Sequence, residues 1–173
     1  LQDLLPEELR GITESAIVLK DFQAKDGAIL QTNIDSNAPT TRTINAAYQP
    51  TISIEAGETQ LWRLANIGAD IYYELQVTGH PFHIIGEDGN PVWQVKSVDS
   101  LVIAPGKRFD VLIQGGEPGS AELKTLEYNQ QGDVYPETLL ATVTINPSDL
   151  KAAELPVKLV EPNDLNEGVV DVS

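Results

Sequence analysis

The only two histidines of the chain, His80 and His83, lie in an otherwise apolar segment, residues 79–86. Two imidazoles three residues apart suggest a metal site. In a strand, however, side chains alternate between the two faces, so this odd spacing directs the rings to opposite sides unless the chain bends at Pro81. We therefore disfavour a shared metal. We expect His80 to close the preceding turn through a hydrogen bond and His83 to face solvent or an interface.

Acidic residues are the second set of candidates for chemistry. A glycosidase needs two carboxyl groups with separated pKa values in one cleft, whereas most of the acidic residues here fall at turns. Arg108 and Asp110 are two residues apart and share a strand face. They could contact an anion, but we favour a pairing with each other or with a neighbouring turn. The carboxylates of the body are Glu87, Asp88, Asp99, Asp110, Glu117 and Glu127.

The aromatic residues offer a third possibility. Trp62 and Trp93, with Tyr72 and Tyr73, could form a platform on which sugars stack. We favour packing in the core and at the sheet edge, because a domain of this size needs large aromatic side chains. No glycine-rich phosphate loop and no nucleophile elbow is present. The residues alone thus predict no catalytic group.

Composition narrows the function further. The chain has 173 residues, 26 acidic against 11 basic ones, a formal charge of −15, no cysteine and no methionine. This length suits one domain. The missing cysteine excludes disulfides, thiol catalysis and thiolate-ligated metals. The charge argues against nucleic acid as a partner, and no apolar run reaches the roughly 18 residues of a membrane span. The missing methionine leads us to expect a piece of a longer chain or a processed form.

The elements that must position these residues read as short strands. About ten or eleven apolar runs recur at 8–12-residue spacing, which is typical of an all-β sandwich or Greek-key barrel. Asp26-Gly27 and Asp88-Gly89 predict hairpins, and Pro105-Gly106 suits a type II turn. We expect short helices only at residues 6–10 and 147–153. The predicted organisation is a lead-in over residues 1–14, a domain over 15–146 and a solvated tail or linker over 147–173.

The order of the motifs resembles the multicopper oxidase family. Residues 42–50 resemble its asparagine segment, and the following segments are similar to its "pGe…rlRliN", "l.l.gH.f.via.DG" and "apGeRyDvlv" stretches; residues 18–23 fit the start of the same domain. These segments are residues 52–58 with 62–66, residues 75–89 and residues 104–112. The residues that carry the motifs, to which we assign structural roles, are Asn45, Gly57, Arg63, Asn66, His80, Asp88, Gly89, Pro105, Gly106, Arg108 and Asp110.

Within that family the pattern resembles the second of three cupredoxin-like domains. The resemblance implies copper held by the first and third domains, which would be this domain's partners, and an exported, periplasmic or secreted parent. That parent would oxidise phenols, amines or metal ions and reduce dioxygen to water. The segment around His80 superficially resembles a copper motif of the third domain, but Ile85 replaces its last histidine. We therefore expect no catalytic, cofactor-binding or metal-binding residue in this chain.

Two other interpretations remain open at this stage. The chain could be a domain of a copper-free relative that acts as a periplasmic interaction protein. It could also be an unrelated β-sandwich that binds a ligand such as a carbohydrate. Flanking sequence would separate the first from an oxidase, and a shallow groove with Trp62 or Trp93 exposed would favour the second.

Overall fold

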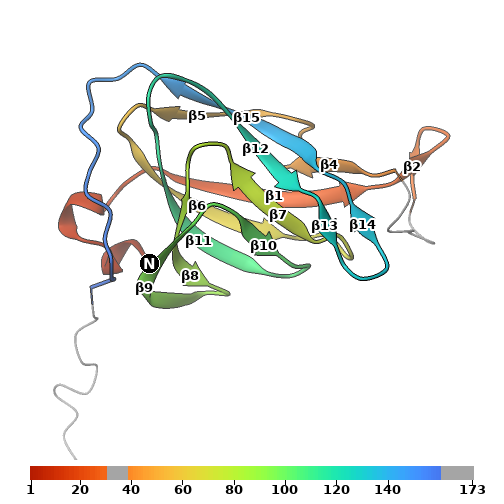
Figure 1. Ribbon diagram of the computed structural model, residues 1–173, viewed down its shortest axis with the longest axis horizontal. Helices are drawn as coiled ribbons and strands as arrows, with labels where there is room; N and C mark the ends of the chain where they lie inside the picture. Colours follow the sequence, from red (N-terminus) through yellow and green to blue (C-terminus); the bar gives the residue numbers. More distant parts are fainter. Residues whose placement is uncertain (31–38, 161–173) are drawn as a thin grey trace, which may run out of the picture.

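The fold is built from two packed β-sheets (Figure 1). The structure, a computed structural model, describes residues 1–30 and 39–160. Over these residues the larger sheet has six strands in the order β4-β1-β6-β11-β8-β9. Its strands are β1 (Glu14–Phe22), β4 (Thr41–Ile44), β6 (Thr59–Asn66), β8 (Phe82–Glu87), β9 (Asn90–Val98) and β11 (Arg108–Gln114).

The smaller sheet lies against it. In the described residues it has five strands in the order β10-β7-β12-β15-β5. Strand β1 pairs with β6, and β15 with β5, in parallel, whereas the neighbours β6–β11 and β7–β12 are antiparallel. The strands are β5 (Thr51–Glu55), β7 (Tyr73–Val77), β10 (Leu101–Ile103), β12 (Gly119–Leu126) and β15 (Thr138–Asn146). The expected all-β architecture is thereby confirmed.

The predicted turns are present. The ribbon of β2 (Ala24–Lys25) and β3 (Ala28–Ile29) turns at Asp26 and Gly27, whose φ angles are 52° and 79°. The β8–β9 hairpin turns at Asp88 and Gly89, with φ angles of 50° and 87°. Two consecutive positive φ values are the mark of the type I′ turn, whose twist matches that of the paired strands. A second ribbon joins β13 (Tyr128–Asn129) and β14 (Val134–Tyr135).

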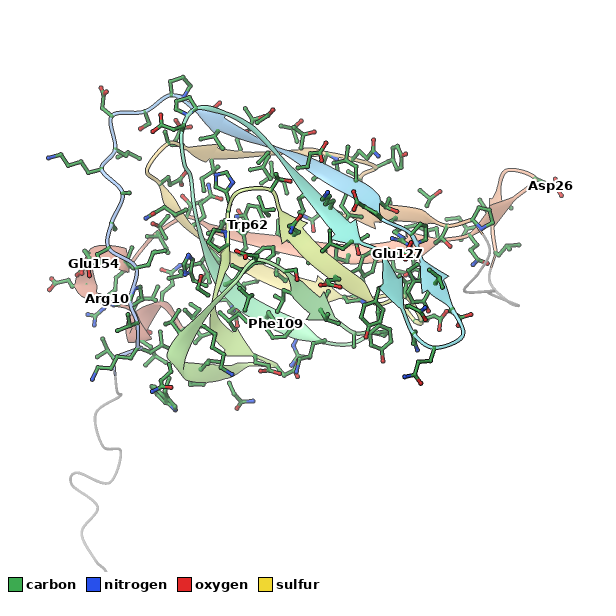
Figure 2. The ribbon with its side chains drawn as sticks, in the orientation of Figure 1. Arg10, Asp26, Trp62, Phe109, Glu127 and Glu154 are labelled. Atoms are coloured by element: carbon green, nitrogen blue, oxygen red, sulfur yellow. The ribbon has the colours of Figure 1, made fainter. Side chains whose placement is uncertain are left out.

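The main core lies between the sheets. Alternate residues of the strands point inward, as in β7, where Tyr73, Leu75 and Val77 are buried and the residues between them are partly exposed. Trp62 is fully buried and points into the interior (Figure 2). Burying a large apolar side chain contributes roughly 1.5–3 kcal/mol, so this layer supplies most of the driving force for folding.

A second, smaller core covers the outer face of the six-stranded sheet. The lead-in contains two single turns of 3-10 helix, η1 (Gln2–Leu4) and η2 (Glu7–Leu9). The second of these stands where we predicted a helix. Its apolar side chains meet residues that β6, β8 and β11 turn outward, and so both faces of these central strands are covered. The buried members are Leu5, Leu9, Leu61, Ile85, Leu112 and Leu159.

Residues 147–160, which we call the strap, run back beside the lead-in (Figure 1). The helix predicted over residues 147–153 is wrong, because this part of the chain is extended. Its polar backbone atoms bond instead to the sandwich: Gln114 Nε2 donates to the Ala153 carbonyl at 2.9 Å. Further along, Leu159 N–H donates to Trp93 O at 3.0 Å, and Val160 N–H donates to Leu4 O at 2.8 Å.

No described helix is long and apolar enough to cross a membrane.

Candidate functional site

His80 lies in the turn between β7 and β8, and both of its ring nitrogens contact the backbone. Nδ1 is 2.9 Å from the Thr78 carbonyl oxygen, and the Gly116 N–H donates to Nε2 at 3.3 Å. This pattern fits one neutral tautomer, with the proton on Nδ1. The backbone N–H of His80 also donates to Val77 O at 3.0 Å. His80 thus closes its turn and holds the turn to the loop after β11.

His83 lies on β8 itself, opposite Leu112 of β11 and Ser97 of β9. It is half-buried, and burial lowers the pKa of its imidazole because the charged form loses hydration. Across the described residues, no three histidine, cysteine, aspartate or glutamate side chains gather closely enough to hold a metal ion. The structure therefore gives His83 no set of ligands to join.

The β8–β9 turn is held to β11 by the carboxylate of Asp88. Its Oδ1 accepts the Arg108 backbone N–H at 2.9 Å, and its Oδ2 accepts from Lys107 Nζ at 2.7 Å. Lys107 also pairs with Glu87. The hydrogen bond from Lys107, followed by that from the Arg108 backbone, lowers the pKa of Asp88. The Arg108 side chain donates to the Gly106 carbonyl at 3.3 Å, which is a contact with a neighbouring turn.

Asp110 faces a different partner. It lies opposite Arg63 in the β11–β6 register, and Arg63 Nε is 3.9 Å from Asp110 Oδ1. Arg63 pairs more closely with Glu14 of β1, at 2.5 Å. Burial raises the pKa of Asp110, and the nearby Arg63 opposes this shift. These charges lie across three neighbouring strands, β1, β6 and β11, and form an ion-pair network on the sheet.

Two asparagines from the motifs replace missing backbone contacts. Asn45, at φ 52°, accepts the Val18 N–H at 2.9 Å and donates to Ala16 O at 2.8 Å, so one side chain completes the pairing beyond β4. Asn66 is buried at the end of β6. Its Nδ2 donates to Ile71 O at 2.8 Å and to Ile103 O at 3.0 Å. Both side chains satisfy buried or edge backbone groups, which would otherwise destabilise the fold.

The remaining motif residues lie at sharp turns or close approaches. Gly57 has φ 77°, and a Cβ there would lie 2.3 Å from the carbonyl oxygen of Leu150 in the strap. Gly106 has φ 80° and follows Pro105 in the turn before β11, which suits the third position of a type II turn. Each of these positions serves the backbone.

The aromatic side chains do not assemble into one platform. Trp62 is buried and donates to Gln60 Oε1 at 2.9 Å. Trp93 lies on the edge strand β9 with 44% of its surface exposed. Among the described residues, ring stacking joins Tyr72 to Tyr128 at 5.4 Å and involves neither tryptophan. A sugar-stacking surface therefore finds no support beyond the exposure of Trp93.

Sequence reasoning missed a buried polar cluster at one end of the sandwich, formed by Asp21, Arg42 and Tyr73. Asp21 and Arg42 face each other in the β1–β4 pair and expose 6% and 5% of their surfaces. The signal was available, because Ile17 and Leu19 precede Asp21 at the same strand parity and all three must face the core. Arg42 lies over the ring of Tyr73, with 5.6 Å from Cζ to the ring centroid.

The fold is that of the cupredoxin-like domains of multicopper oxidases. A laccase-like multicopper oxidase from the lignin-degrading bacterium Ochrobactrum sp. superposes with a TM-score of 0.73 at 19% identity, over 88% of this chain and 35% of that one. The multicopper oxidase of Campylobacter jejuni gives a TM-score of 0.71 at 23% identity, over 88% and 33%. At these identities the likeness concerns the fold.

Sequence comparison supplies the family. The multicopper oxidase family model matches residues 15–120, so the chain belongs to the multicopper oxidase family. Laccase-18 of Oryza sativa subsp. japonica is 31% identical over 105 residues, which is 54% of this chain and 17% of that protein. A laccase of Neurospora crassa is 33% identical over 75 residues, 43% of this chain and 12% of that one. The chain thus spans less than a fifth of these relatives.

The donor groups of this chain do not fit the copper that the family implies. A blue-copper centre needs a thiolate together with imidazoles, and the chain has no cysteine and two histidines. The ring nitrogens of His80 contact Thr78 and Gly116 of the domain itself. The residues present therefore assemble no copper centre of this kind, and no step of a reaction can be assigned to copper held by them.

Proposed function

We propose that this chain is the middle cupredoxin-like domain of a multicopper oxidase, a structural spacer between two copper-bearing domains. The observation that carries the proposal is the family match over residues 15–120 in a chain without cysteine. The motif residues support it, because Asn45, Asn66, Asp88 and His80 all bond to backbone atoms of the domain. They maintain the shape of a scaffold.

In this proposal the chemistry belongs to the parent protein. The parent would oxidise phenols, amines or metal ions and reduce dioxygen to water at copper sites in its first and third domains, and this domain would form one wall of the substrate pocket. As in other members of the family, we propose that the parent is periplasmic or secreted. No catalytic, cofactor-binding or metal-binding residue is assigned to the domain itself.

The surface offers a place for a neighbouring domain. Trp93 on β9 and Val157 and Val160 of the strap expose 44%, 81% and 43% of their surfaces. They adjoin one another, because the strap pairs with β9 through the Val95 N–H to Val157 O bond at 3.0 Å. Apolar side chains gathered in this way are typical of a protein–protein contact. We assign this contact to another domain of the same parent.

Copper analysis of the purified chain tests the proposal directly. After incubation with Cu²⁺ and dialysis against a weak chelator, we expect no stoichiometric copper and no oxidation of a phenolic substrate. One tightly held copper ion that disappears in both His80→Gln and His83→Gln would contradict the proposal. A copper ion lost in neither variant would indicate a site elsewhere and would contradict it equally.

The reading frame around the chain tests the claim about the parent. We expect His-x-His segments on both sides and a His-Cys-His segment on the C-terminal side. If they are missing, the parent is a copper-free relative that acts as an interaction protein. In that case Trp93→Ser and Val157→Ser should still reduce the binding of the remaining domains, because the spacer role does not depend on copper.

A further inference from the structure

Two buried polar atoms have no protein partner within residues 1–30 and 39–160: Asp21 Oδ1 and the Tyr73 hydroxyl oxygen. Asp21 exposes 6% of its surface and Tyr73 none. Asp21 lies on β1 of the larger sheet and Tyr73 on β7 of the smaller one. Buried polar groups without a partner are rare in folded proteins, so each of these atoms calls for a hydrogen-bonding molecule.

A third group converges on the same place. Asn66 ends β6, and its Oδ1 accepts the Gly68 N–H at 2.9 Å, which leaves one lone pair available. A Cβ on Gly68 would lie 2.3 Å from Asp21 Oδ1 and 3.0 Å from Asn66 Oδ1. The two acceptor oxygens therefore approach the connection between β6 and β7 together, and only glycine at position 68 leaves room for them.

The charges around this place balance. The Asp21 carboxylate lies opposite the Arg42 guanidinium in the β1–β4 pair. Arg42 donates to Pro136 O at 3.1 Å and to Thr138 Oγ1 at 3.2 Å, so it is held in position by other groups. Burial, reinforced by Asp21, raises the pKa of Tyr73 far above its usual value, and the phenol is neutral. An added ion would leave a net buried charge, whereas a neutral molecule would not.

We propose that one water molecule is bound here, accepting a hydrogen bond from the Tyr73 hydroxyl and donating to Asp21 Oδ1 and Asn66 Oδ1. Three hydrogen bonds are the usual number for a buried water. This water joins β1, the end of β6 and β7, and so it links the two sheets at the end where Arg42 and Tyr73 meet. Its site is independent of the proposed spacer function.

The experiment combines crystallography with water magnetic relaxation dispersion on the full chain. We expect electron density for one ordered water between the three groups, and a dispersion signal from a long-lived water. In Tyr73→Phe that signal should shrink by one water, or its residence time should fall at least tenfold. The matched control is Tyr135→Phe, a buried tyrosine at the same end whose hydroxyl already contacts Gln130 at 3.2 Å. Its signal should equal that of the parent chain.

Three results would overturn the proposal. The first is density that shows Asp21 and Tyr73 bonded directly, with nothing between them. The second is a peak that depends on sodium or potassium and disappears in choline buffer. The third is an unchanged dispersion signal in Tyr73→Phe. If that variant fails to fold, density and dispersion of the unmodified chain in sodium and in choline buffer still decide between water, cation and direct contact.

Discussion

Gly57 lies directly against the carbonyl group of Leu150, so closely that a Cβ on residue 57 would be 2.3 Å from that oxygen. The glycine also has φ 77°, in the left-handed region. Any other residue at position 57 would have to push the strap away from the β5–β6 turn. The strap and the sandwich are therefore fitted to each other at this point.

The first prediction concerns this contact. Gly57→Ala should lower the free energy of unfolding by roughly 2–4 kcal/mol, the sum of the strain of a left-handed alanine and the displacement of the strap. Gly27→Ala is the matched control, because Gly27 has φ 79° and a methyl group added there would meet nothing within 4 Å. It should cost only about 1 kcal/mol. Urea unfolding measures both, and equal losses would show that the strap does not pack on Gly57.

The second prediction concerns Asn45. Asn45→Gly accepts the φ of 52° without strain but loses the two side-chain bonds to β1. The unfolding free energy should therefore fall by about 1–2 kcal/mol. Ala46→Gly is the control, because Ala46 has φ 65° and glycine should relieve its strain. A loss of stability in Ala46→Gly as large as that in Asn45→Gly would contradict the role given to the side chain.

The third prediction is a pH dependence at Asp88. Lys107 and the Arg108 backbone lower the pKa of Asp88 in the folded chain. A carboxyl whose folded pKa is depressed stabilises the fold above its unfolded pKa, and this contribution is lost as the pH falls through the folded pKa. Asp88→Asn should therefore be less stable than the parent at neutral pH, and the two should converge in acid.

Lys107→Met tests the cause of that shift. Because the hydrogen bond from Lys107 is its largest source, this variant should return the Asp88 pKa toward its ordinary value. Titration of the side-chain carboxyl by NMR measures the change. An Asp88 pKa that is the same in Lys107→Met and in the parent would refute the assignment.

The fourth prediction separates the two sides of the strap. Leu159 is 2% exposed in the smaller core, and Leu159→Ala should lower the unfolding free energy by about 2–4 kcal/mol through loss of burial and a residual cavity. Val157, with 81% of its surface exposed, provides the control, and Val157→Ala should change the stability of the isolated chain by less than about 0.5 kcal/mol. If Leu159→Ala is equally harmless, the strap contributes nothing to folding.

Turns were the most predictable part of the fold. Asp26-Gly27 and Asp88-Gly89 specify their own backbone angles, and strand alternation then follows from neighbouring residues. The helix predicted over residues 147–153 failed for the opposite reason. Its local sequence tolerates a helix, but the backbone groups of this segment find partners on β11 and β9, far away in the sequence. Short segments take the structure that their tertiary partners impose.

The candidate site shows the same division. The turn position of His80 was predictable because its bonds there are local, to Thr78 and Val77. Its contact with Gly116 was not predictable, since 36 residues separate the two. The cluster of Asp21, Arg42 and Tyr73 likewise depends on which strands become neighbours. Alternation indicates which side a residue faces, but not what it meets there.

The hydrogen bond from the Val160 N–H to the Leu4 carbonyl also has a mechanical meaning. It places residues 4 and 160 side by side, so a force that pulls them apart acts first on this one contact and on the seat of Leu159. The paired strands would carry no load until those had given way. In a longer protein that flexes, such an arrangement would keep tension out of the sandwich and let the rest of the molecule move around a rigid block.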